Sequence, residues 1–113
     1  MRYLMLFGLV MLPGAACNSN NPPTTNEVVM RDFSFAPESL NVSVGDTVTW
    51  VNNGAYAHTT TSGETGSPDG KWNSGSLVPG VSFEHVFTEA GNYHYYCSLH
   101  GATYNMKGVA SVH

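Results

Sequence analysis

The segment CSLHGATYNM, residues 97–106, places three side chains that bind metals within ten residues. Cys97 offers a thiolate, His100 an imidazole and Met106 a thioether, and a second imidazole, His58, lies upstream in NNGAYAHTTT. Thiolate and thioether are soft ligands that suit copper in its Cu(I) state, and two histidines, a cysteine and a distant methionine together are typical of a type 1 copper site. We therefore predict one copper ion bound by His58, Cys97, His100 and Met106.

Such a ligand set favours electron transfer over catalysis. A plane of two histidines and a cysteine with a weak axial methionine suits neither oxidation state of copper perfectly, so little rearrangement separates Cu(I) from Cu(II). We find no second cluster of metal ligands, as in copper oxidases, and no pattern of a substrate pocket, so we do not expect an enzyme. Two alternatives stay open: a copper carrier or chaperone, and a metal-free sandwich used in adhesion. Cys97 also has a simpler interpretation, a disulfide with Cys17.

Length and charge restrict the other classes of function. The chain has 113 residues, only 11% of them charged, and a formal net charge of −4. This length predicts one folded domain. Only four residues are Lys or Arg, which argues against a nucleic-acid partner, because such proteins need a basic surface to neutralise phosphates.

The first 26 residues have the pattern of an export segment and a linker. Residues 1–16 combine an early positive charge, an apolar run and small residues at the end, which predicts a signal peptide. The small residues that lead into Cys17 resemble a bacterial lipobox, which implies lipid attachment at Cys17 and a membrane-anchored lipoprotein. Ordinary cleavage after Ala16 is the alternative. Residues 17–26 are polar and predict a flexible tether, so we expect a periplasmic or cell-surface protein.

Residues 27–113 predict an all-β sandwich of about eight strands. Short runs with apolar residues at every second position alternate with turn residues, and no apolar period typical of a helix extends over 11 residues. The segment 62–80 is rich in Gly, Ser and Pro and predicts a long loop or an irregular strand. The predicted strands lie in 27–33, 35–53 (two strands with a turn at Gly45-Asp46), 57–61, 81–87, 92–97 and 107–112.

Residues 27–113 resemble small cupredoxins of the plastocyanin, pseudoazurin and halocyanin type. The resemblance is carried by an A-H-T motif at His58, by C-x-x-H followed by a methionine, and by an upstream pattern. It implies a Greek-key β-sandwich with copper at one end, bound by His58 Nδ1, Cys97 Sγ, His100 Nδ1 and Met106 Sδ. It also implies a monomer that meets redox partner proteins briefly near His100. The upstream pattern consists of Phe35, Pro37, Leu40, Val42, Gly45, Asp46, Val48, Trp50 and Asn52.

Three positions depart from the family pattern. Five residues separate His100 from Met106, where plastocyanins usually have four. Leu99 stands where plastocyanins commonly have proline, and we expect its N–H to point at the Cys97 sulfur, since proline has no such donor. Thr59 stands where the family often has asparagine, which leaves the link between the two ligand loops open.

Other polar and aromatic residues receive simpler roles. His85, His94 and His113 are expected to be structural or exposed, and Trp72 is expected to cover the core. Apolar residues around His100, namely Val78, Pro79 and Leu99, are expected to frame a contact surface for partners. The acidic residues are scattered and are expected to be solvated: Asp32, Glu38, Glu64, Asp69, Glu84 and Glu89.

Overall fold

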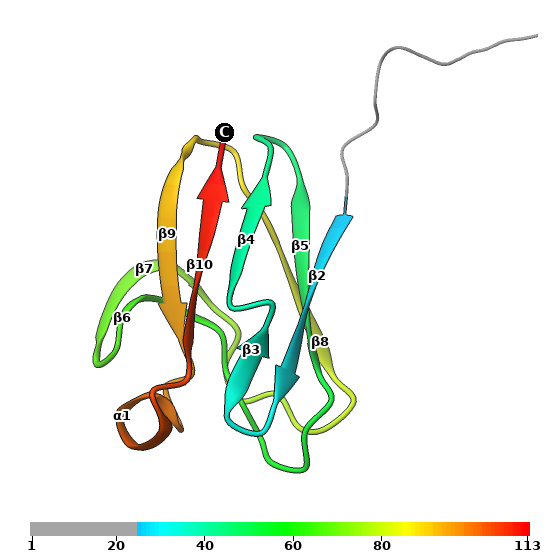
Figure 1. Ribbon diagram of the computed structural model, residues 1–113, viewed down its shortest axis with the longest axis vertical. Coiled ribbons are helices and arrows are strands. Elements are labelled where there is room, and N and C mark those ends of the chain that lie inside the picture. The colour runs from blue at the N-terminus through cyan, green and yellow to red at the C-terminus, as the bar shows by residue number, and fades with distance from the viewer. Residues whose placement is uncertain (1–24) are drawn as a thin grey trace, which may run out of the picture.

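The computed structural model describes residues 25–113, and nearly all of their regular structure is β-strand (Figure 1). One helix of four residues, α1 (Gly101–Tyr104), is the exception. The predicted signal peptide, Cys17 and most of the predicted tether lie outside the described residues. The strands are β2 (Thr25–Arg31), β3 (Ser34–Ala36), β4 (Ser39–Val42), β5 (Thr47–Asn52), β6 (Thr61–Glu64), β7 (Ser67–Asn73), β8 (Ser82–Val86), β9 (Gly91–Tyr96) and β10 (Lys107–Val112).

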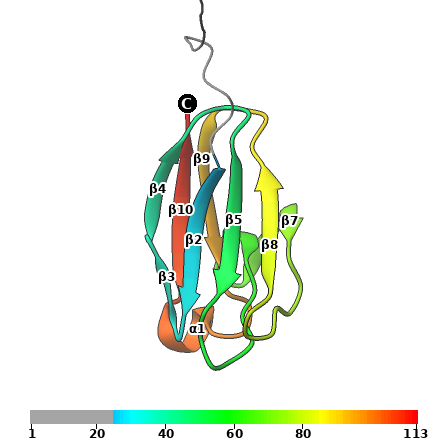
Figure 2. The same cartoon turned by 90° about the vertical axis from the view of Figure 1, so that its right-hand side faces the viewer.

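These strands form two sheets that pack as a sandwich. One sheet has five strands in the order β4-β10-β9-β6-β7, and the other has four in the order β3-β2-β5-β8. The parallel pairs β2–β5 and β4–β10 join segments that are distant in the chain, which requires connections that cross between the sheets. Figure 2 shows the strands running along the long axis of the domain. The predicted β-sandwich is confirmed.

The core lies between the sheets and follows the alternation seen in the sequence. In β5 every second residue is buried, so Val48, Trp50 and Asn52 face inward. Trp50 packs edge-on against Tyr95 of the opposite sheet, with ring centroids 5.3 Å apart. Burial of such large side chains stabilises the fold by about 1.5–3 kcal/mol each.

The segment 57–80 differs from the prediction. Residues 57–60 are not in a strand, since His58 makes only an isolated bridge with Leu77, and β6 begins at Thr61. The segment 62–80, predicted as a long loop or an irregular strand, contains most of the hairpin of β6 and β7. In β7 only Trp72 is buried, so the strand has no alternating pattern to reveal it. Pairing with β6 and the packing of Trp72 in the core form this strand instead. Trp72 covers the core, as expected.

The candidate metal ligands meet at the end of the sandwich that lies opposite the C-terminus. Figures 1 and 2 place α1, the β2–β3 turn and the connection from β5 to β6 at this end. His58 lies in that connection, and His100 directly precedes α1. Among the described residues, no helix has the length and apolar character needed to cross a membrane.

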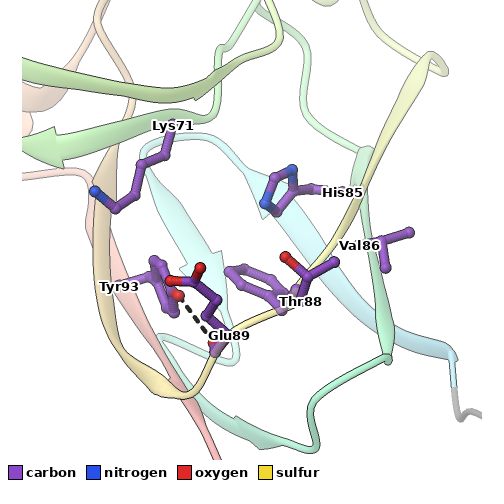
Figure 3. Close-up of a pocket in the computed structure, with 7 residues that line it drawn as sticks. Lys71, His85, Val86, Thr88, Glu89 and Tyr93 are labelled. Carbon is purple, nitrogen blue, oxygen red and sulfur yellow. Dashed lines mark hydrogen bonds between the residues drawn. The ribbon is translucent and has the colours of Figure 1, made fainter.

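His85 closes one side of the core beside Trp72. Its ring lies 4.7 Å from the Trp72 ring and 4.7 Å from that of Phe87. Figure 3 shows His85 at the wall of an open hollow that Tyr93 also lines, and the Tyr93 hydroxyl donates to the Glu89 carbonyl at 2.8 Å. Partial burial lowers the pKa of His85 from its ordinary value.

This pKa shift predicts that His85 makes the fold less stable in mild acid. Because the pKa of His85 is lower in the folded than in the unfolded protein, the unfolded state binds more protons once the pH falls below about 6.5. We expect His85→Gln to reduce the loss in free energy of unfolding between about pH 7.5 and pH 5.5. Urea unfolding at both pH values measures it, with exposed His113→Gln as the control. An identical pH dependence in His85→Gln and the native chain would contradict the prediction.

Candidate metal centre

Backbone hydrogen bonds hold the two ligand-bearing segments in place. The N–H of His58 donates to the Leu77 carbonyl at 3.0 Å, and the Leu77 N–H donates back to the His58 carbonyl at 2.8 Å. Cys97 follows β9, and its N–H donates to the Met106 carbonyl at 3.0 Å. The N–H of His100 donates to the Cys97 carbonyl at 3.3 Å, so all four predicted ligand residues have main-chain hydrogen bonds to other residues.

The side chains of His58, Cys97 and His100 converge on one point. His58 Nδ1 lies 3.1 Å from His100 Nδ1, and Cys97 Sγ lies 3.8 Å from the first and 3.6 Å from the second nitrogen. His58 and Cys97 are fully buried, whereas His100 is partly exposed. Cys97 is a free cysteine, so the disulfide interpretation is wrong. The structure brings together three of the four residues that the sequence singled out.

The size of this cluster fits a single metal ion. A triangle with these three sides has a centre about 2 Å from each corner, which is the length of a bond from a metal to an imidazole nitrogen. Two nitrogens and one sulfur are the in-plane donors of a type 1 copper site. In the described part of the chain, this is the one group of three or more such side chains that could hold a metal.

Met106 follows His100 by six residues in the chain and is almost completely buried. The five residues between His100 and Met106 contain α1, which begins after His100, ends at Tyr104 and is capped by Asn105. Asn105 has a positive φ of 57°, which is a left-handed conformation that asparagine tolerates. This short helix takes up the fifth residue of the spacer between His100 and Met106. The chain then turns back, so that the Met106 carbonyl accepts a hydrogen bond from the Cys97 N–H.

Thr59 links the two ligand loops. Its N–H donates to Cys97 Sγ at 3.3 Å, and its hydroxyl oxygen accepts the Ser98 N–H at 2.8 Å. The threonine therefore makes the link that the sequence left open. The expectation for Leu99 is wrong: within residues 25–113, the backbone N–H that donates to the sulfur is that of Thr59. In the turn that follows Cys97, the N–H groups of His100 and Gly101 donate to the Cys97 carbonyl.

Aromatic rings surround the exposed edge of the cluster. Phe33 stacks on Tyr104, with ring centroids 3.9 Å apart, and lies edge-on to His100 at 4.9 Å. Tyr56 also stacks on Phe33, with ring centroids 5.5 Å apart. Burial and the nearby His58 lower the pKa of His100, which favours the neutral ring that can bind a metal. These rings were not predicted, since they come from three separate loops.

Asp32 was predicted to be a solvated surface residue; it is exposed, but it also contacts His58, which the sequence did not predict. Its Oδ1 accepts a hydrogen bond from His58 Nε2 at 3.0 Å. The backbone N–H of Ala55 donates to both carboxylate oxygens, at 3.1 and 2.9 Å. The Ala55 N–H and His58 lower the pKa of Asp32 below its ordinary value. No motif of the sequence marks this contact, because 26 residues separate the aspartate from its histidine. His85, His94 and His113 lie outside the cluster.

The Thr59 link predicts a loss of stability when its hydroxyl is removed. Thr59→Val keeps the shape of the side chain but removes the acceptor for the Ser98 N–H, which is expected to cost about 1–2 kcal/mol. Urea unfolding of the metal-free protein measures the change in the free energy of unfolding. Thr49→Val, at a half-buried position in β5, is the control and is expected to have little effect. Equal stabilities of the two variants would contradict this role of Thr59.

Comparison with known proteins agrees with the fold and with copper binding. The family model for copper-binding proteins of the plastocyanin/azurin family matches residues 23–113. Plastocyanin of Scenedesmus fuscus is 36% identical over 85 residues, which cover 69% of this chain and 85% of that protein. Chloroplastic plastocyanin of Tetradesmus obliquus is 34% identical over 73 residues, which cover 58% of this chain and only 50% of that protein.

Solved structures give the same picture. A purple cupredoxin from Nitrosopumilus maritimus superposes with a TM-score of 0.71 at 32% identity, covering 78% of this chain and 99% of that one. A mutant of amicyanin in its reduced state superposes with a TM-score of 0.67 at 28% identity, covering 79% and 82% of the two chains. A copper-containing nitrite reductase from Thermus scotoductus also matches, with a TM-score of 0.67 at 28% identity, but 84% of this chain covers only 23% of that protein.

A two-sheet sandwich holds two imidazoles and a buried thiol at one end, at the spacing of a single metal ion. The family match covers the whole described domain. The chain therefore belongs to the plastocyanin/azurin family of copper-binding proteins, the cupredoxins that carry single electrons between partner proteins.

Proposed function

We propose that His58 Nδ1, Cys97 Sγ and His100 Nδ1 bind the copper ion and that Met106 Sδ is its weak axial ligand. The observation that carries this assignment is the convergence of the first three atoms, whose separations are 3.1, 3.8 and 3.6 Å. Met106 is the remaining soft donor of the loop, and only 1% of its surface is exposed. Its backbone carbonyl accepts a hydrogen bond from the Cys97 N–H. Bound copper supplies one-electron chemistry by cycling between Cu(I) and Cu(II).

The protein's own residues hold the donor atoms in place. The Thr59 N–H donates to the thiolate sulfur and spreads its negative charge. The Leu77 bridge holds the backbone of His58, and the aromatic rings of Phe33 and Tyr104 pack around His100. Because the donors are already in place, little of the protein needs to reorganise during electron transfer.

His100 is proposed as the residue through which electrons enter and leave. It is the one partly exposed member of the cluster. Tyr56, Tyr104, Leu99 and Val78 are each at least half exposed, so this end of the domain is apolar and rich in rings. A surface of this kind supports brief contact with a redox partner protein, with little charge to slow release.

We further propose that the protein acts outside the cytoplasm as a monomeric carrier and not as an enzyme. The support is the signal-peptide pattern in residues 1–16 and the small residues before Cys17, which suggest membrane attachment through a lipid. The nitrite reductase match covers only a part of that enzyme. The described domain has one ligand cluster, which is sufficient for a carrier.

Copper binding is tested by titrating the metal-free protein with Cu(II). We expect one equivalent to produce an intense visible band from thiolate-to-copper charge transfer, and a reversible one-electron titration. Cys97→Ser is expected to lose the band, while Cys17→Ser keeps it and serves as the matched control. A protein that binds only colourless Cu(I) would favour the copper chaperone, and a protein that binds no stoichiometric copper would favour the adhesion module.

The axial role of Met106 is tested by Met106→Leu. Leucine keeps the volume and removes the thioether, so the oxidised ion loses a donor and Cu(I) becomes favoured. We expect the copper band to persist and the midpoint potential to rise. Met30→Leu, at an equally buried position in β2, is the control and is expected to leave the potential unchanged. A Met106→Leu protein with the native potential would refute the axial assignment.

A further inference from the structure

The tight turn between β2 and β3 contacts both imidazoles of the metal centre. It consists of Asp32 and Phe33, with Asp32 against His58 and Phe33 against His100. Phe33 has a φ of 97°, which is rare for a bulky residue and marks a backbone conformation that the surrounding packing must maintain. The stacked rings of Tyr104 and Tyr56 provide that packing.

The Asp32 carboxylate is held firmly in place on His58. Three backbone contacts orient it, two from the Ala55 N–H and one from the Tyr56 N–H at 3.4 Å. Gly54 leaves room for it, because an added Cβ at that position would lie 2.9 Å from Asp32 Cγ and 3.1 Å from His58 Nε2. The contact therefore has support from its own loop and is not an incidental surface pair.

A carboxylate can only accept hydrogen bonds, so the proton shared with His58 belongs to Nε2. The Nδ1 of the neutral ring then presents its lone pair toward Cys97 Sγ and His100 Nδ1. A carboxylate on the outer nitrogen also makes the imidazole a stronger donor and orients its ring. Its negative charge, which lies 3.0 Å from the fully buried ring, favours the more positive state of a bound metal.

We propose that Asp32 is a positioning residue for the copper site: it fixes the Nε2–H tautomer of His58 and lowers the reduction potential of the centre. This inference rests on the proposed ligand role of His58. Asp32 acts through the histidine and does not itself bind copper. Gly54 contributes to the same arrangement, because the absence of a side chain there allows the Asp32 carboxylate to reach the His58 ring.

The potential of the copper-loaded full chain is the first test. Asp32→Asn keeps the shape and an acceptor oxygen but removes the charge. We expect this variant to bind one copper ion with the native visible band and to lower the ratio of Cu(II) to Cu(I) affinity about tenfold, which corresponds to a midpoint about 59 mV higher. Glu84→Gln removes an exposed charge from β8, away from the centre, and is the matched control. A midpoint that is the same in Asp32→Asn and Glu84→Gln would overturn the inference.

The metal-free full chain gives a second test that does not depend on copper. Long-range ¹H–¹⁵N correlation spectra report which ring nitrogen of His58 carries the proton. We expect a persistent Nε2–H signal in the native chain, and in Asp32→Ala at least about tenfold faster exchange of that proton with water, since the carboxylate that accepts its hydrogen bond is gone. Gly54→Ala is expected to resemble Asp32→Ala, because it displaces the carboxylate. Equal exchange in all three chains would overturn the inference. A native chain that binds no copper but shows this difference would refute the ligand assignment and the effect on the potential, and would support only the effect of Asp32 on the His58 tautomer.

Discussion

The convergence of two nitrogens and one sulfur on a single point is the constraint on which the arrangement of the surrounding loops depends. These atoms lie on two loops that are 39 residues apart in the chain. Thr59 joins the loops by donating to Cys97 Sγ and accepting from Ser98, and the bridge with Leu77 holds His58 from the other side. Backbone and hydroxyl groups thus impose the spacing of the site, which suits a centre that exchanges electrons without rearrangement.

A second layer of contacts lies outside the donors and acts on each histidine differently. The buried His58 contacts a carboxylate, whereas the partly exposed His100 contacts aromatic rings. The first contact adds charge and fixes a proton, and the second adds an apolar surface through which a partner can approach. Both contacts begin in the same two-residue turn, so the electronic character and the accessibility of the site are set by neighbouring residues.

Much of the fold was predictable because burial between two sheets imposes a period of two on the sequence. The boundaries of β10 match the prediction, and the inward residues of β5 follow its alternation. The region of β7 was left open between a long loop and an irregular strand, because only Trp72 is buried in it. Asp32 was missed because its significance arises from a contact between loops. The sulfur donor was misassigned to Leu99 because main-chain orientation in a tight turn cannot be inferred from residue type.

The sequence by itself determined the chemistry that is available: a thiol, two imidazoles and a thioether in an order typical of one metal centre, on a chain patterned for a β-sandwich. Residue type is sufficient for this, because softness and charge belong to individual side chains. Only the tertiary structure decided which atoms lie close together and that Thr59 links the loops. It also decided that the β2–β3 turn places the Asp32 carboxylate against Nε2 of His58. Those outcomes depend on distances between segments far apart in the chain, which are set by the packing of the two sheets.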